Sequence, residues 1–272
     1  MNLLDFLDEL GQADSTGSLE RRSSLLRLSR VAAAALPFAL AGVATPARAQ
    51  RIGTLLDLVK LALQLARLQQ ALYGRARTAP GLADLHSAIE PLYVHETQHV
   101  TRLEKVVLDS GGELPTTVNY DFTGSRNGAD PAIFPADVFT NRATFLSVAQ
   151  TVEDACVRAG KTLLPLLMSD NDLMRLAVSM QAVQARHSAY VRRLRGQKAW
   201  VSQVEGNGPV PGKTDFAYAG EDRVKQPLTA TSEQNITELT GYGTPDKLAP
   251  ITQAFDEPLG ISAEALLAKF TY

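Results

Sequence analysis

The chain has 272 residues, enough for one large domain or two small ones, and its 45% apolar and 21% charged residues are those of an ordinary globular protein. Its net charge of −2 and its scattered Lys and Arg residues argue against a nucleic-acid-binding protein. Cys156 is the only cysteine, so no disulfide can form within the chain, and its apolar helical surroundings predict a buried, inert thiol.

The first 49 residues predict an export signal. Arg21 and Arg22 precede an apolar run over residues 31–43, and Ala47-Arg48-Ala49 supplies a small-residue cleavage site. The paired arginines are typical of the twin-arginine route, which exports folded proteins. The run is too short to span a bilayer comfortably. We therefore expect a mature chain that begins near Gln50, has no stable membrane span and lies in the periplasm or cell envelope.

Four long segments carry apolar residues at helical spacing. We expect helices over about 52–77, 82–110, 135–168 and 170–200. Pro80-Gly81 separates the first two, and Gly111-Gly112 ends the second. Pro91 inside the second segment predicts either a kink or a later start. Asp170 or Asn171 is the expected N-cap of the fourth helix.

The lengths of the connections predict the topology. The links within the first and second helix pairs are short, whereas residues 111–134 form a long polar connection. This is the connectivity of an all-α, ferritin-like four-helix bundle with one crossover, which we expect over residues 50–200. Residues 201–272 are rich in Gly and Pro and predict an irregular extension that wraps the bundle, with a short helix near Ser262–Lys269. Its apolar residues are expected to dock on the bundle rather than stay disordered: Phe216, Tyr218, Leu239, Phe255, Leu259 and Leu266.

The candidate functional residues lie in three of these helices. Glu96 and His99 are three residues apart, which places both on one helical face. Ferritin-like di-metal proteins use a Glu from each of two helices and a Glu-x-x-His from each of the other two. Glu153 and His187 supply parts of that pattern in the third and fourth helices. We predict that the four residues converge inside the bundle as metal ligands.

Two carboxylates of the full pattern are missing. Gln184 stands three residues before His187, where a second Glu-x-x-His would carry Glu. Glu153 precedes His187 by 34 residues, and the same offset from His99 predicts position 65 or 66 as the facing position of the first helix. Leu65 and Ala66 stand there. His95 is about 100° round the helix from Glu96 and is expected outside the site.

This incomplete set leaves three alternatives open. Two imidazoles and two carboxylates suit one Fe, Mn or Zn ion. A full di-metal centre is less well supported, because half of the carboxylates are gone. In a metal-free polar core, Glu96 would pair with His187 and Glu153 with His99, because buried carboxylates need such partners to stay ionised.

The chain resembles exported bacterial ferritin-like domain proteins, which are related to desiccation-associated proteins of plants and bacteria. The resemblance covers about residues 52–196 and rests on Leu63-Gln64-Leu65-Ala66-Arg67-Leu68, Glu96-Thr97-Gln98-His99, Val152-Glu153-Asp154 and Gln184-Ala185-Arg186-His187. The usual family pattern has glutamates where Ala66 and Gln184 stand here, which implies a degenerate di-iron site. The resemblance also implies a stress- or desiccation-associated role.

The remaining functional expectations are few. The sequence contains no nucleophile elbow, phosphate loop or Cys-x-x-Cys motif, so we assign no catalytic residue and no organic cofactor. The favoured function is an exported protein that binds at most one Fe or Mn ion through Glu96, His99, Glu153 and His187. The alternatives are a non-catalytic structural or stress-protection bundle and, with less support, a di-iron ferroxidase or oxidase. A homo-oligomer is left open.

Overall fold

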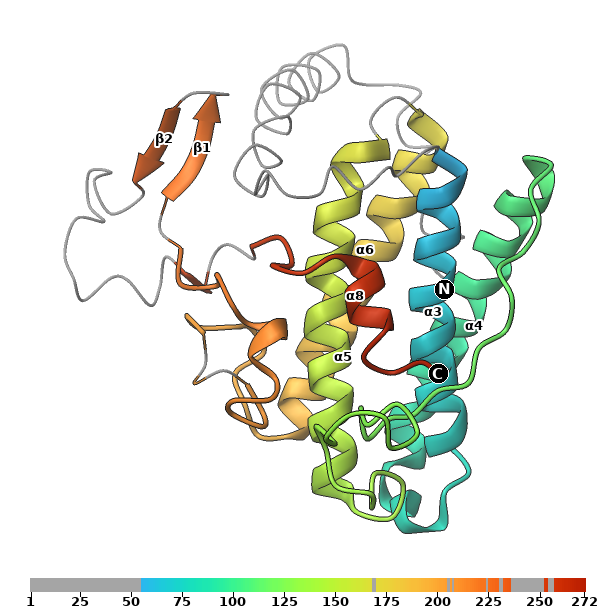
Figure 1. Cartoon of the computed structure of the whole chain (residues 1–272), viewed down its shortest axis with the longest axis vertical. Coiled ribbons are helices and arrows are strands. Elements are labelled where there is room, and N and C mark those ends of the chain that lie inside the picture. Colours follow the sequence, from blue (N-terminus) through green and yellow to red (C-terminus); the bar gives the residue numbers. More distant parts are fainter. Residues whose placement is uncertain are drawn as a thin grey trace, which may run out of the picture.

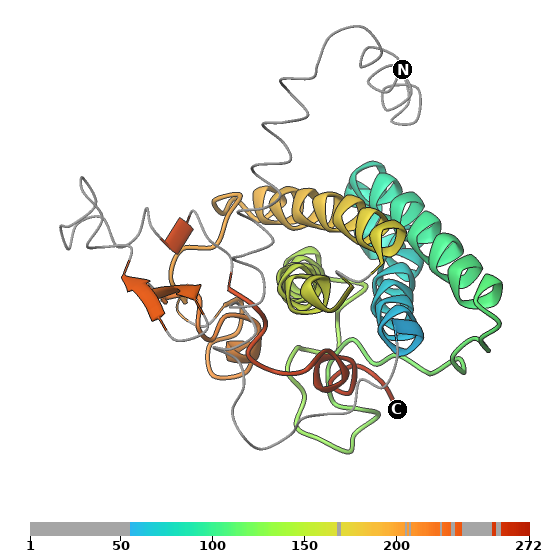
Figure 2. The ribbon, with the colours of Figure 1, turned by 90° about the horizontal axis from the view of Figure 1, so that it is seen from above.

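Four long helices form the bundle in the computed structural model, which describes residues 55–167, 170–204, 206, 208–223, 225–229, 232–235, 252–253 and 257–272 (Figures 1 and 2). The helices are α3 (Leu55–Ala76), α4 (His86–Asp109), α5 (Arg142–Leu163) and α6 (Asn171–Leu194). The contacts are densest between α3 and α4 and between α5 and α6. The predicted all-α, ferritin-like architecture is therefore confirmed, while the expected export signal lies outside the described residues.

Local sequence signals set the helix ends. The side chain of Asn141 caps α5 by accepting from the backbone N–H of Ala143, so α5 begins several residues later than Pro135, near which the sequence predicted its start. Asp170 caps α6 in the same way through Asp172 and Leu173, as predicted. These caps satisfy N–H groups that have no partner within the helix.

Pro91 marks a late helix start. The segment before α4 forms a 3₁₀ helix, η1 (Pro80–Leu85), and α4 begins at His86 rather than near residue 82. Pro91 consequently lies in the second turn of α4, where its missing N–H deprives only one carbonyl, that of Ser87, of its helical partner.

The long crossover runs back along the outside of the bundle, so that α4 and α5 point the same way (Figure 1). It packs against the core through Phe122 and Phe134, which are almost fully buried. The chain end pairs with it, because Asp121 N–H donates to the carbonyl of Phe270 at 2.8 Å and Tyr272 N–H donates to that of Asn119.

The C-terminal extension packs on the outside of the bundle, where its described short helices contact α3 and α5. It includes η4 (Asp215–Ala217), the hairpin of β1 (Lys225–Thr229) and β2 (Ser232–Asn235), and α8 (Ala263–Leu267), which Ser262 caps. Tyr218, Leu259 and Leu266 are buried as expected, and Phe216 is half-buried. Leu239 and Phe255 lie outside the described residues.

A buried arginine of α5 anchors this extension. Arg158 donates to the carbonyls of Ala217, Ala219, Glu257 and Pro258 and pairs with Glu221 at 2.6 Å. Five donors in a rigid fork allow one guanidinium to hold two separate stretches of the tail.

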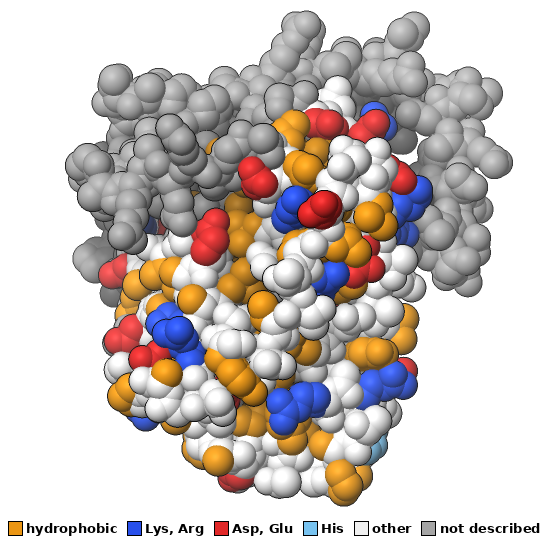
Figure 3. All heavy atoms as spheres, turned by 45° about the vertical axis from the view of Figure 1, so that its right-hand side comes forward, with side chains coloured by type: hydrophobic (Ala, Val, Ile, Leu, Met, Phe, Trp, Pro, Cys, Tyr) orange, Lys and Arg blue, Asp and Glu red, His pale blue; other side chains and the backbone are white. Residues whose placement is uncertain are grey.

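The surface shows two further features. On the face in Figure 3, acidic and basic side chains are interspersed rather than gathered by sign. Within the described residues, no helix is both long and apolar enough to cross a membrane.

Candidate metal centre

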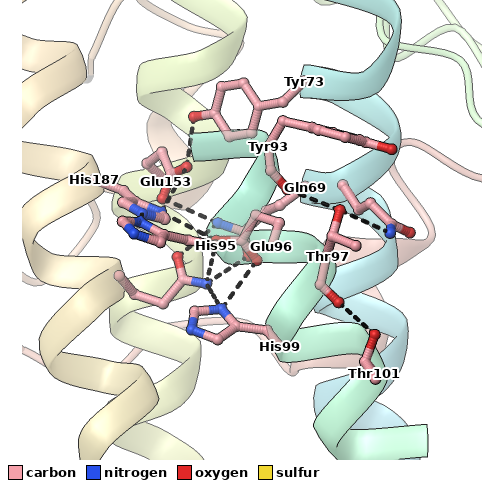
Figure 4. Close-up of polar contacts among 12 residues, drawn as sticks. Gln69, Tyr73, Tyr93, His95, Glu96, Thr97, His99, Thr101, Glu153 and His187 are labelled. Atoms are coloured by element: carbon pink, nitrogen blue, oxygen red, sulfur yellow. Dashed lines mark hydrogen bonds and ion pairs between the residues drawn. The ribbon is translucent and has the colours of Figure 1, made fainter. Parts of the chain in front are cut away.

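Polar side chains from all four helices meet at one point inside the bundle (Figure 4). Every one of them is buried, and they are Gln69 and Tyr73 from α3, Glu96 and His99 from α4, Glu153 from α5, and Gln184 and His187 from α6. The spacing of three or four residues within α3, α4 and α6 places each pair on one helical face. The structure thus brings together the four residues that the sequence singled out, and their role as ligands stays a prediction.

Three of these residues could hold one metal ion. Glu96, Glu153 and His187 each offer a ligand atom, and these atoms all lie within 4.8 Å of one another. Nδ1 of His187 is 3.0 Å from Oε1 of Glu96 and 3.9 Å from Oε1 of Glu153. Glu96, Glu153 and His187 form the only such group of potential metal ligands among the described residues. His99 stands beside it, with Nδ1 3.2 Å from Oε2 of Glu96.

A reciprocal pair of glutamines holds the two carboxylates apart. Nε2 of Gln69 donates to Oε1 of Gln184 at 2.7 Å and to Oε2 of Glu153 at 3.0 Å. Nε2 of Gln184 donates to Oε1 of Gln69 at 3.1 Å and to Oε1 of Glu96 at 2.9 Å. Each amide therefore uses one hydrogen on its partner and the other on a carboxylate. Tyr73 completes the set by donating to Oε1 of Glu153 at 2.5 Å.

The prediction that His95 lies outside the site is wrong. Nδ1 of His95 shares a 2.9 Å hydrogen bond with Nε2 of His187, and the two ring planes are within 6° of parallel. Although His95 points about 100° away from Glu96, α6 packs on that side of α4, so both residues face it. His95 is only half-buried and connects the buried His187 to the surface.

The position predicted for the first helix is also wrong. Ala66 lies in an apolar cluster with Leu63 and Leu103, and the α3 residues that reach the site are Gln69 and Tyr73. An equal offset in the two helix pairs requires both pairs to turn at the same distance from the site. However, α3 ends seven residues after Gln69, at Ala76, whereas α5 ends ten residues after Glu153, at Leu163.

Asp154, which follows Glu153 in the chain, is buried as well. It accepts hydrogen bonds from Ser188, Arg192 and Tyr218, so it joins α5 to α6 and to the C-terminal extension rather than entering the metal centre. Cys156 is a buried free thiol, as expected, and burial raises its pKa well above the usual range.

The two carboxylates differ in acidity. Burial, reinforced by the charge of Glu96, raises the pKa of Glu153 to about 8, even though His187 and the bonds from Tyr73 and Gln69 favour its ionised form. Burial also opposes ionisation of Glu96, but its close contacts with His187 and His99 outweigh burial and lower its pKa. Without metal, the site therefore carries one carboxylate and one neutral carboxylic acid at neutral pH.

One buried atom of the site has a requirement that a cation would meet. Nδ1 of His187 lies 3.0 Å from Oε1 of Glu96, but the contact is misaligned for a hydrogen bond. No other described residue forms a hydrogen bond with this nitrogen. A buried, unpartnered ring nitrogen is costly in an apolar interior. An ion between Nδ1 and the two carboxylates would satisfy it, since imidazole and carboxylate both bind Fe, Mn and Zn.

Sequence reasoning missed Gln69, Tyr73 and His95. The first two had a usable signal, because they are four residues apart on the buried stripe of α3 and are polar. His95 had no comparable signal, since its place depends on how α6 packs against α4.

Comparison with known proteins agrees with this architecture. A search of curated proteins found no match. The model of the ferritin-like domain family matches residues 54–197, more than half of the chain and the whole of the four-helix bundle. The chain therefore belongs to the ferritin-like domain family.

Proposed function

We propose that this is an exported ferritin-like protein that holds one divalent ion, Fe or Mn, through Glu96, Glu153 and His187. The observation that carries the proposal is the buried Nδ1 of His187, which lies between two carboxylates without a hydrogen-bond partner. His99, which the sequence added to this set, contacts Glu96 and acts as its neighbour or as a fourth ligand.

Charge limits the site to one ion. Glu96 and Glu153 together neutralise one divalent cation, while Gln69 and Gln184 contribute no charge. A second ion would leave two uncompensated positive charges in a fully buried position, where the penalty is several kcal/mol per ion.

The surrounding residues prepare the ligands. When Nε2–H of His187 donates to Nδ1 of His95, the lone pair of Nδ1 of His187 faces the carboxylates. The glutamine pair and Tyr73 fix the orientation of both carboxylates. When bound, Fe or Mn would supply one-electron redox chemistry. This suits a role in limiting oxidative damage during stress or desiccation, which the family resemblance also supports.

Metal content of the full chain tests the assignment. Elemental analysis of protein purified without a metal-binding tag should find up to one Fe or Mn per chain, and added Mn(II) should raise the melting temperature. His187→Gln should lose both effects. His86→Gln is the matched control, because His86 lies on α4 away from the site and contacts the carbonyl of Ala79. Equal metal binding by the two variants would refute the site.

The alternative is a metal-free polar core, and the closed glutamine network favours it. Apart from Nδ1 of His187, the side-chain nitrogens and oxygens of the seven central residues that lie fully buried have hydrogen-bond partners without any ion. In that case the wild type would bind no metal, and its melting temperature would not respond to Fe(II) or Mn(II). The bundle would then serve as a structural or stress-protection module.

Export is tested separately. Intact mass of the native protein should correspond to a chain that begins near Gln50, recovered outside the cytoplasm. A cytosolic species that retains residues 1–30 would refute this part of the proposal without affecting the metal site.

A further inference from the structure

An apolar cavity runs along the bundle next to the metal centre. Three helical stripes line it, from Leu58 to Gln69 on α3, from Cys156 to Leu167 on α5 and the 3₁₀ turn η2 (Leu164–Leu167) that continues it, and from Leu173 to Gln184 on α6. Each stripe covers twelve residues and therefore eleven steps along the helix, so the cavity is about 16 Å long at a rise of roughly 1.5 Å per residue. Its inner end is the glutamine pair itself.

The lining excludes water as the natural occupant. The cavity has a volume of about 90 Å³, which is room for roughly six to nine waters at about 10–15 Å³ each. Each water would need two to four polar partners. The only amide side chains on the wall are those of Gln69, Gln181 and Gln184, and their nitrogens already donate elsewhere, Gln181 to the carbonyl of Val157.

The shape is that of a slot rather than a round pocket. Its small volume is spread over three helical turns on each of three helices, and nearly all of its wall is aliphatic. An extended chain advances about 3.5 Å for every three covalent bonds, so ~16 Å accommodates on the order of a dozen methylene groups.

We infer that this cavity binds a single, unbranched alkyl chain of on the order of a dozen carbons, with its tail end against Gln69 and Gln184. The occupant is a molecule with one saturated chain, because a volume of about 90 Å³ spread over ~16 Å leaves no width for a branch or a ring, and the amides at the inner end already donate their N–H groups to other side chains. The inference does not rest on the metal, so it can fail while the metal site stands.

Chain-length dependence tests the inference. We would measure binding of n-alkanols, from hexanol to tetradecanol, to the full chain by equilibrium dialysis. Affinity should rise roughly fourfold for each added methylene, the factor that corresponds to about 0.8 kcal/mol, and should level off near a dozen carbons with one alkanol bound per chain. An affinity that rises without a plateau would overturn the inference, because it would indicate unspecific partition.

Filling the slot gives the second readout. Ala66 is buried on the cavity wall, eight residues beyond Leu58, so Ala66→Leu should block the inner end and shorten the plateau by roughly a quarter. Ala182→Leu is the matched control, because Ala182 is exposed on α6. Thermal unfolding checks that both variants fold. An identical plateau in the two variants would overturn the inference. Sedimentation with phosphatidylcholine vesicles in the absence of alkanol binding would overturn it as well, because the protein would then recognise a lipid surface.

Discussion

Restoring the two missing carboxylates should create a second metal position. In the double variant Gln69→Glu plus Gln184→Glu, two neutral amides become acids at the centre of the site. In the wild type, the two amides donate one hydrogen bond each to one another, and they donate one each to Glu153 and Glu96. None of the four survives when both donors become ionised acceptors.

The cost can be bounded from the two bonds to carboxylates. The bond to the ionised Glu96 is worth about 1.5–3 kcal/mol and the bond to the neutral Glu153 about 0.5–1.5 kcal/mol, so their loss alone should lower the free energy of unfolding by at least about 2 kcal/mol in the metal-free variant. Repulsion among four buried carboxyl groups adds to this unless some of them stay protonated. With metal, two divalent ions neutralise four carboxylates, and an ion at about 100 times its dissociation constant returns roughly 2.7 kcal/mol.

Thermal unfolding and calorimetric titration with Mn(II) measure both effects. We expect the double variant to melt below the wild type without metal, to gain more from metal, and to bind close to two ions per chain where the wild type binds one. The control is Gln64→Glu plus Gln98→Glu, which adds the same charge on α3 and α4 outside the network. Two tight sites in the wild type, or no added metal response in the double variant, would refute this account of the site.

Three further predictions follow from other contacts. Because the pKa of Glu153 is raised to about 8, the folded metal-free protein keeps a proton that the unfolded chain loses near pH 4.5. Its free energy of unfolding should therefore fall by several kcal/mol as the pH rises from about 4.5 to about 8. The Glu153→Gln variant should lack this fall when its unfolding is measured over the same pH range. Arg158→Met should lower the free energy of unfolding by about 3–5 kcal/mol and speed proteolysis of the C-terminal extension, because Glu221 and four carbonyls lose their donor. The control variant Arg175→Met changes a highly exposed residue and should have neither effect. Burial opposes ionisation of Asp121, but hydrogen bonds from Ser125, Thr123 and Asn127 lower its pKa to about 2. Asp121→Asn should therefore lower the free energy of unfolding above about pH 4. In acid titrations, the difference in stability between this variant and the wild type should vanish as the pH falls through about 2.

The sequence predicts the bundle well because one physical signal, apolar residues at a period of 3.6, runs through all four helices. Helix ends are predicted less well where capping rather than periodicity decides them. The apolar pattern reached back to Pro135, but Val138 is buried in the turn before α5, and the Asn141 side chain starts the helix. Apolar burial outside a helix gives the same sequence pattern as burial within one.

The site shows a sharper division. Spacing within a helix correctly grouped Glu96 with His99 and Gln184 with His187. Spacing between helices failed, as the choice of Ala66 over Gln69 shows, because the distance from the site to each turn differs between the two helix pairs. The contact of His95 with His187 was missed for a related reason: which side of α4 faces α6 is a property of the packing and cannot be read from either helix alone.

The glutamine pair explains how this bundle can fold without a metal-rich centre. Gln has nearly the shape of Glu, so Gln69 and Gln184 fit positions where carboxylates would otherwise face the site. Unlike Glu, each supplies two N–H donors, one for its partner and one for a remaining carboxylate. These N–H donors stabilise the carboxyl groups of Glu153 and Glu96, as a second metal ion would otherwise do. The two glutamines, which limit the centre to one ion in the function we propose, therefore also stabilise its metal-free form.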